Sequence, residues 1–336
     1  MVVRVYEQSE DTTSLIVRLK KILNANLGGD YLNNFPSSDE EINLLKFISM
    51  YQYLDIKDTH YFFSTQKYYK KRISNLIAKK YLKKFNFHYL ILDKLGIEFA
   101  SLFNFQYNKL NRNQKYLPRL LYISKLAAFY NKSNTVKFIP SFSMKDKQEF
   151  TTTSRKFIGI FEISGIEYLT YYLTNEHTDK YLRLVIYDLQ KEKQYKNIII
   201  LTNDENRIKS NLFVFGFNQV LVVKDTEENR EKLKYLHSIN WYNIIKEQYK
   251  RSNIYLSDYS FCEYTDYKNK YINTFYFFDT EKVNRINYFL EENKDKNVDI
   301  VCNSQLKERL IKELPNCNYC IIDLEQYIDK EPFYYD

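Results

Sequence analysis

The feature that most constrains the fold is a change of apolar period between Ser38 and Leu92, from helical spacing to strand spacing. A helix is predicted to begin at Ser38, because Ser38 and Glu41 have the S-x-x-E order of a capping box. Four apolar residues then follow at helical spacing, namely Leu44, Phe47, Ile48 and Tyr51. This stripe predicts that one face of the first helix is buried.

Two further helices are predicted before the period changes. The second begins near Asp55, with Asp58 in its first turn, and its predicted buried residues are Ile56, Tyr61 or Phe62, and Phe63. The third runs from Gln66 to Lys79 after a short turn, and we expect Ser64 to be its N-cap.

The third helix has two chemically different faces. Its apolar face contains Tyr69, Ile73, Leu76 and Ile77. Its other face contains Gln66, Lys67, Lys70, Lys71, Ser74 and Ala78. Long hydrogen-bond donors beside small residues suit a helix that approaches base edges closely, so this face is predicted to enter the major groove of DNA.

A two-stranded hairpin is predicted next, from Tyr81–Phe85 and His88–Leu92. Lys83, Lys84 and Asn86 would lie near its tip, within reach of phosphates or the minor groove. Three helices followed by such a hairpin predict an N-terminal winged helix-turn-helix, and Asp93 then opens another helix that ends at about Phe103.

Charge is distributed unevenly along the chain. Residues 59–92 contain eight Lys and Arg and no Asp or Glu, and residues 59–145 contain 17 Lys and Arg against two acids. The rest of the chain has 33 basic and 40 acidic residues. A localised basic segment predicts a polyanionic partner, here double-stranded DNA, and the lack of nearby acids suggests lysines without ion-pair partners. The predicted DNA contacts are Gln66, Lys67, Lys70, Lys71, Arg72, Ser74, Lys83, Lys84, Asn86, Lys109, Arg112 and Lys115.

The length of 336 residues suits about two domains. Residues 1–37 are interpreted as an arm with one helix at Thr12–Asn26, which acts as a strap or a dimerisation helix. The winged helix takes residues 38–104. Residues 105–135 would be a basic connection, flexible over 104–115, followed by a helix at Tyr116–Tyr130. The remainder, 136–336, is predicted to be a mixed α/β domain.

Strands and helices alternate in this predicted α/β domain. The expected strands are Lys137–Phe142, Lys156–Ile163, Glu167–Thr174, Asn197–Thr202, Gln219–Val223, Thr274–Phe278, Val298–Cys302 and Asn318–Asp323. The expected helices are 178–193, 204–213, 226–248, 281–293 and 304–313. Residues 198–223 and 298–322 resemble each other weakly. A duplicated fold would explain this, but shared βαβ geometry explains it as well, and we favour the latter.

Residues 38–223 resemble the replication-relaxation family of plasmids and conjugative elements. The similar features are LLKFISMYQYLDIKDTHYFF, the basic third helix and the hairpin ending in YLILDKLGIEFA. The resemblance implies a DNA-binding protein of a mobile element that acts in plasmid replication, its control or conjugative transfer. It also implies that the α/β domain is a divergent restriction-endonuclease-like fold. Expected partners are double-stranded DNA, other replication or transfer proteins and a second copy of the chain.

The catalytic motifs of such nucleases are not intact in this sequence. Pro140 is followed by Ser141 where the family pattern has Asp, and the expected E-x-K is missing from the strand at 167–174. The nearest substitutes are Glu162, Glu167 and Asp179. We therefore interpret the domain as inactive and expect no cofactor. A DNA nuclease or nickase targeted by the winged helix remains the alternative, as does a transcription regulator.

Other site types find little support in the sequence. Cys317-x-x-Cys320, with Cys262 and Cys302, would be half of a zinc site, but buried apolar cysteines explain them better, so no metal is expected. The chain has no Walker A motif and no dinucleotide-binding G-x-G-x-x-G. It also lacks an apolar run long enough for a membrane span and a secretion signal at its start, which predicts a cytoplasmic protein. Frequent Tyr, Lys, Asn and Ile, with few Gly and Pro, suggest an A/T-rich genome, as in a low-GC bacterium.

Overall fold

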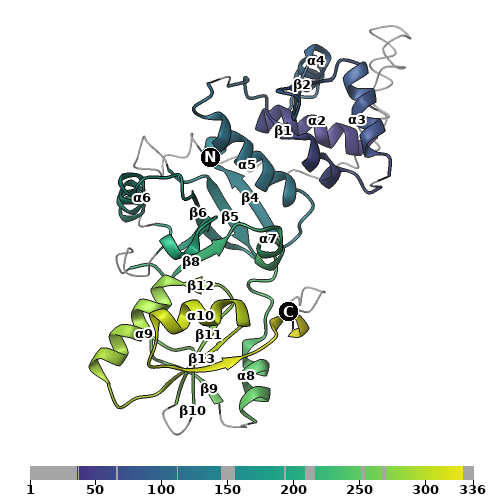
Figure 1. Ribbon diagram of the computed structural model, residues 1–336. Helices are drawn as coiled ribbons and strands as arrows, with labels where there is room; N and C mark the ends of the chain where they lie inside the picture. Colours follow the sequence, from purple (N-terminus) through teal and green to yellow (C-terminus); the bar gives the residue numbers. More distant parts are fainter. Residues whose placement is uncertain are drawn as a thin grey trace, which may run out of the picture. The chain divides into compact units, whose positions relative to one another are not determined.

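The computed structural model of the chain describes residues 36, 38–65, 67–111, 113–144, 156–192, 194–208, 216–250, 254–266 and 270–327. The described residues form a mixed α/β structure with three sheets. The chain divides into two compact units, Met1–Lys132 and Ser133–Asp336 (Figure 1). The helix predicted at 12–26 lies outside the described residues.

The first unit surrounds a small sheet with helices. The sheet has the order β1-β3-β2, and its central strand is antiparallel to both neighbours. In chain order the elements are α2 (Asp39–Tyr51), β1 (Leu54–Asp55), the 3₁₀ helix η2 (Ile56–Phe62), α3 (Tyr69–Ala78), β2 (Leu82–Phe85), β3 (Tyr89–Leu92), α4 (Lys94–Leu102) and α5 (Leu117–Phe129).

Helix α2 begins as the sequence predicts. The Ser38 hydroxyl accepts a hydrogen bond from the Glu41 N–H at 3.3 Å, which satisfies one of the N–H groups that a helix start leaves without a partner. The predicted stripe of Leu44, Phe47, Ile48 and Tyr51 is buried. This helix therefore provides the apolar surface on which the rest of the unit is assembled.

The second predicted helix takes a tighter form. It is a 3₁₀ helix, and Asp55 caps it by accepting the Lys57 N–H at 2.8 Å. Phe62 is its buried aromatic residue, at 2% exposure, whereas Ile56 is only half-buried. The sequence analysis missed β1 directly before it, because a two-residue strand shows no alternation.

The prediction for the start of the third helix was wrong. Helix α3 starts at Tyr69, without a side-chain cap, and not at Gln66. Ser64 does not cap it. The Ser64 N–H instead donates to Glu40 Oε1 at 2.6 Å, so this turn is tied to the first turn of α2. Gln66 itself lies outside the described residues.

The segment expected to be a flexible connection is bonded to the end of α2 over residues 106–111. Asn108 donates its N–H to the Ser49 carbonyl at 2.9 Å and its Nδ2 to the Met50 carbonyl at 2.6 Å. The Tyr53 hydroxyl donates to the Asn111 carbonyl at 2.8 Å. The two bonds from Asn108 satisfy carbonyls that the last turn of a helix leaves without partners, and all three bonds fix this part of the connection in place. The helix predicted after it is present as α5.

A glycine is required where α4 passes the hairpin. A Cβ atom at Gly96 would lie 2.2 Å from the Tyr81 carbonyl oxygen, which no other residue can tolerate without movement of the backbone. The same Tyr81 carbonyl accepts a hydrogen bond from the Asp93 N–H at 2.9 Å, which joins the residue before the hairpin to the residue after it. Close packing of α4 against the Tyr81 carbonyl therefore explains the glycine in YLILDKLGIEFA.

The second unit contains two larger sheets. Its strands are β4 (Val136–Pro140), β5 (Gly159–Ile163), β6 (Ile166–Leu173), β7 (Asn197–Thr202), β8 (Gln219–Lys224), β9 (Ile254–Leu256), β10 (Tyr264–Asp266), β11 (Tyr271–Phe275), β12 (Phe278–Asp279), β13 (Val298–Cys302) and β14 (Asn318–Ile321). Its helices are η3 (Ser141–Met144), α6 (Asp179–Lys191), η4 (Glu205–Arg207), α7 (Glu227–Leu233), α8 (Trp241–Tyr249), α9 (Thr280–Glu292), α10 (Ser304–Glu313) and η6 (Leu324–Tyr327).

The two sheets share one topology. In the first, β4, β5 and β6 form an antiparallel meander, and β7 and β8 continue it in parallel with β6. In the second, β9, β10 and β11 form the meander, and β13 and β14 continue it in parallel with β11. The repeat therefore covers five strands in the same order and directions. This exceeds a shared βαβ unit, so the structure favours the duplicated fold that the sequence analysis had set aside.

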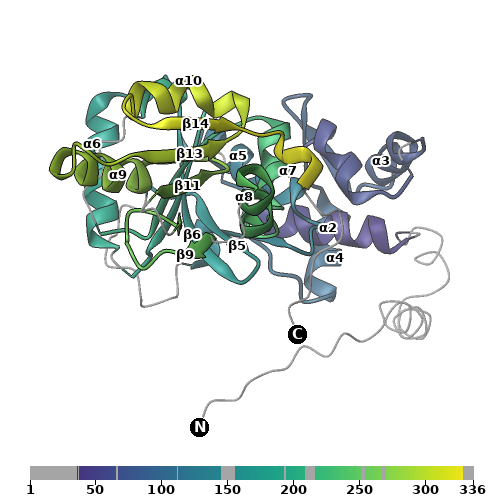
Figure 2. The same ribbon diagram turned by 90° about the horizontal axis from the view of Figure 1, so that it is seen from below.

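One short strand joins the two sheets of this unit. β12 follows β11 of the second sheet, yet it pairs with β8 at the edge of the first. Asp279 in β12 is 2% exposed, accepts the Val220 N–H at 3.2 Å and caps α9 through the Glu281 and Lys282 N–H groups. Figure 2 shows α9 and α10 beside β11, β13 and β14, where their apolar residues share a core with these strands.

Several details of this unit differ from the sequence analysis, and one is that the strand predicted at Thr274–Phe278 is divided between β11 and β12. The helix predicted at 226–248 is two helices, α7 and α8, because Asn240 caps the second by accepting the Asn243 N–H at 3.1 Å. Strands β9 and β10 were missed, since each has only three residues. Of the helix predicted at 204–213, the described part is the short η4, and the rest lies outside the described residues.

Candidate nucleic-acid interface

Helix α3 has the two faces that its sequence predicts. Ile73 and Leu76 are buried, and Tyr69 and Ile77 are half-buried. The exposed side chains of residues 67–78 are Lys67, Tyr68, Lys70, Lys71, Ser74, Asn75 and Ala78. The apolar face packs into the unit while the lysine face is turned to solvent.

Arg72 fixes α3 to α2. Its Nη1 donates to Glu40 Oε2 and, at 3.2 Å, to the Ser38 hydroxyl, and the guanidinium lies 5.5 Å from the centre of the Phe63 ring. Burial disfavours ionisation of Glu40, but the Ser64 N–H and the Arg72 charge outweigh it, so the pKa of Glu40 is lowered. Arg72 was predicted to contact DNA. In the structure its guanidinium is paired with Glu40 and Ser38, which connects α3 to the start of α2, and the DNA contact of Arg72 stays a prediction.

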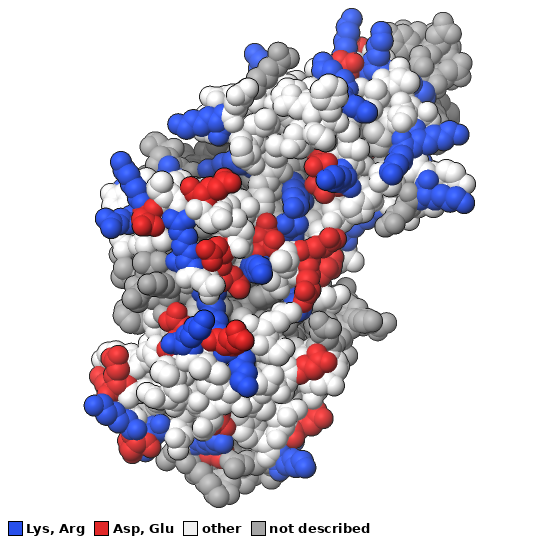
Figure 3. Space-filling view, viewed as in Figure 1, with Lys and Arg blue, Asp and Glu red and all other residues white. Residues whose placement is uncertain are grey.

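Lys70 and Lys71 of α3 and Lys67 in the turn before it, together called the α3 lysines, have no such partners within the described ranges. No carboxylate of the described residues pairs with Lys67, Lys70 or Lys71. The first turn of α3 contains no acidic residue and no side-chain cap. Figure 3 shows basic side chains projecting from the surface around α3. An anion approaching this face would therefore meet positive charge and the N-terminal end of a helix, which also favours anions.

The β2–β3 hairpin adds a second group of polar residues. Lys84, Asn86 and His88 are exposed at or near its tip. Lys83 is also exposed, but its Nζ donates to Asp93 Oδ1 at 3.1 Å, so it is partly neutralised. The basic residues of this segment were expected to lack acidic partners. This holds for Lys67, Lys70 and Lys71, whereas Arg72 is paired with Glu40 and Lys83 with Asp93.

Lys109 lies away from this face. It belongs to the segment bonded to the last turn of α2, whereas Arg72 docks on the first turn. Ten residues of helix separate Glu40 from Met50, which corresponds to roughly 15 Å. Lys115 is exposed near the start of α5, and Arg112 lies outside the described residues. The sequence analysis did not include Lys80, which is exposed directly after α3 with φ of 61°.

The three carboxylates considered for a nuclease do not form one cluster. Glu162 and Glu167 are directly opposite each other on β5 and β6. Asp179 follows the other end of β6, where it accepts a hydrogen bond from Arg207 Nη2 at 3.1 Å. The described residues contain no group of three or more His, Cys, Asp or Glu side chains placed to hold a metal ion.

The cysteines are spread through apolar surroundings. Cys262, Cys302 and Cys317 are buried and Cys320 is half-buried, all as free thiols. Burial raises the pKa of the Cys302 and Cys317 thiols to about 12, which disfavours the thiolate form that binds zinc. In the part of the chain that the structure describes, no helix has the length and apolar character needed to cross a bilayer.

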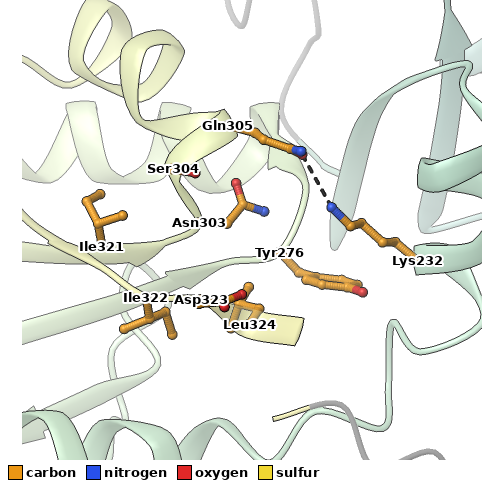
Figure 4. A pocket seen from close by; sticks show the side chains of 9 residues that line it. All are labelled: Lys232, Tyr276, Asn303, Ser304, Gln305, Ile321, Ile322, Asp323 and Leu324. Atoms are coloured by element: carbon orange, nitrogen blue, oxygen red, sulfur yellow. Dashed lines mark hydrogen bonds between the residues drawn. The ribbon is translucent and has the colours of Figure 1, made fainter. Parts of the chain in front are cut away.

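A pocket of about 250 Å³ lies where β13 and β14 end and α10 begins (Figure 4). Its lining is mixed: Lys232, Tyr276, Asn303, Ser304, Gln305, Ile321, Ile322, Asp323 and Leu324. Lys232 Nζ is already engaged by Glu228 Oε1 at 2.6 Å and by Gln305 Oε1 at 3.4 Å. The positive charge at this pocket is therefore largely used within the protein.

Comparison with known proteins finds no family model, no curated protein and no solved structure that matches this chain. Function therefore has to be inferred from the arrangement of its own residues.

Proposed function

We propose that the first unit is a winged helix-turn-helix that binds double-stranded DNA. In this proposal α3 lies in the major groove and the β2–β3 hairpin is the wing. Two helical elements, α2 and η2, precede α3, and the hairpin follows it, which is the element order of that motif. The exposed Lys67, Lys70 and Lys71 would contact phosphates or bases, and Ser74 is small enough for close approach.

The observation that carries the proposal is that, in the described part of the chain, Arg72 is paired within the protein whereas the three exposed lysines near it are not. Arg72 is bonded to Glu40 and Ser38, while three lysines on the neighbouring face have no carboxylate partner among the described residues. Unpaired positive charge on a rigidly docked helix is what recognition of a polyanion needs, because the helix angle must be fixed before side chains can reach a groove.

We further propose a role in a mobile element, in plasmid replication, its control or conjugative transfer. The support for this is the resemblance of residues 38–223 to the replication-relaxation family. The second unit would then supply a surface for a second copy of the chain or for other replication or transfer proteins.

A matched pair of triple variants tests DNA binding. Lys67, Lys70 and Lys71 are replaced by Ala in one, and Lys180, Lys307 and Lys312, which are exposed in the second unit, are replaced by Ala in the other. Both variants lose the same charge. Fluorescence anisotropy with a labelled 30-base-pair duplex should show the first binding more weakly, on the order of 100-fold at low salt, since three phosphate contacts are lost. The second should bind within about threefold of the parent. Equal weakening in both would mean that only net charge matters.

A further inference from the structure

The tip of the β2–β3 hairpin carries an apolar side chain that nothing covers. Phe87 is 86% exposed, which is the highest value among the large hydrophobic residues of the described chain. Within residues 81–92 every other apolar side chain is buried or half-buried. The hairpin therefore has one aromatic ring in solvent, at the point farthest from its base.

The backbone of the tip forms a defined turn. Asn86 and Phe87 have φ of 46° and 62°, in the left-handed region that non-glycine residues seldom adopt, and the His88 N–H donates to the Asn86 carbonyl at 2.8 Å. Below the tip, Leu82 and Leu90 are fully buried, and the Phe85 ring lies 5.4 Å from that of Tyr53. A glycine would adopt the same turn with less strain, so the turn itself does not require Phe at this position.

The surroundings of Phe87 are basic and polar. Lys84, Asn86 and His88 are exposed beside it, and residues 59–92 contain no acidic residue. An apolar ring between cationic and hydrogen-bonding side chains suits a surface that is anionic at its edges and apolar between them. The minor groove of duplex DNA meets this requirement when a base step opens, because phosphates line both rims and the faces of the stacked bases admit an apolar side chain.

On the basis of the proposed DNA binding, we infer that Phe87 is a wedge that enters the minor groove and partly unstacks one base step. The α3 lysines and Lys84 would hold the duplex while the ring is inserted. Insertion of an apolar side chain between base pairs kinks and untwists DNA. The protein would therefore change the shape of its site as well as bind it, which goes beyond the contacts made by α3.

A linking-number assay with the full chain tests this inference. Nicked plasmid is saturated with protein and closed by ligase, and the topoisomers are resolved on a gel after the protein is removed. The variant is Phe87→Gly, which relieves the left-handed strain, so loss of the effect cannot be attributed to a misfolded hairpin. Phe87→Trp retains a stacking ring. Tyr255→Ala is the matched control, because Tyr255 is 56% exposed in the second unit.

We expect the parent, Phe87→Trp and Tyr255→Ala to lower the linking number in proportion to bound protein. Phe87→Gly should bind the duplex about tenfold more weakly, the scale of one lost aromatic–base contact, and at saturation it should leave the linking number unchanged. A linking-number change equal to that of the parent would overturn the wedge while leaving DNA binding intact. If the parent binds duplex DNA but does not change its linking number, the wedge also fails. If the parent binds no duplex at all, the proposed function fails with it.

Discussion

His177 shows how a single residue in the loop between β6 and α6 responds to pH. Its Nδ1 accepts the Thr174 N–H at 2.9 Å, so the bonded nitrogen must be unprotonated. Burial, together with the nearby Arg207 guanidinium, lowers the pKa of His177 below its ordinary value of 6.5. The unfolded chain therefore binds the proton more readily than the folded one.

This difference predicts a pH dependence with a definite sign. The contribution of His177 to stability is fully present above pH 6.5 and is lost as the pH falls below it. We expect His177→Asn, whose side-chain oxygen can accept the same N–H without titrating, to reduce the loss of thermal stability between pH 7 and pH 5. At pH 8 the variant and the parent should unfold at similar temperatures. Parallel losses in the two proteins from pH 7 to pH 5 would contradict this role of His177.

Several residues could be assigned correctly from sequence, and the failures have a common cause. Ser38 was identified as a cap because the S-x-x-E order lies within one turn. Ser64 has the same chemistry, but its backbone is used by Glu40, 24 residues earlier in the chain. Arg72 was grouped with the neighbouring lysines in the sequence, because the sequence does not show that Glu40 pairs with it in the fold. Local patterns do not show which distant carboxylate reaches a side chain.

At the scale of elements, Arg72 links α3 to α2 through charge-assisted hydrogen bonds. Arg72→Ala removes charge-assisted hydrogen bonds to Glu40 and Ser38 and the contact with Phe63, so we expect the free energy of unfolding to fall by roughly 1–2 kcal/mol. Lys71→Ala removes the same charge from the adjacent exposed position and should change stability by less than about 0.5 kcal/mol. Urea unfolding followed by circular dichroism measures both.

The two variants should also differ in their effect on DNA binding. Lys71→Ala is expected to weaken DNA binding while the fold is unaffected, and Arg72→Ala acts on the fold first. Equal losses of stability in the two variants would show that Arg72 does not fix the helix pair.

Long elements were more predictable than short ones. Helix α2 could be located from its apolar periodicity, and β7 and β13 could be located as short, mostly apolar runs, which are typical of buried parallel strands. Strand β1 has two residues and β9 and β10 have three, which is too short for an apolar pattern, so these strands are recognised only by their pairing. The polar segment at 104–115 looked flexible, yet Asn108 bonds part of it to carbonyls of α2 that no sequence pattern could indicate.

At the scale of the whole molecule, the chain combines a basic unit with a duplicated α/β unit. The sequence showed only the weak resemblance of residues 198–223 to 298–322, and the full five-strand repeat became visible once the strand pairing was known. Residues 59–145 carry most of the excess positive charge, and the remainder is slightly acidic. This separation would direct a polyanion to one part of the chain.

The salt dependence of DNA affinity tests the central claim most directly. Binding of the full chain to a 30-base-pair duplex is measured by anisotropy from about 50 to 300 mM salt. If about six phosphates are contacted, log K should fall against log salt concentration with a slope of about −5, and the Lys67, Lys70 and Lys71 triple Ala variant should reduce this to about −2.5. Absence of binding at low salt, or a slope that the triple variant leaves unchanged, would contradict the assignment of α3 as the DNA-binding helix.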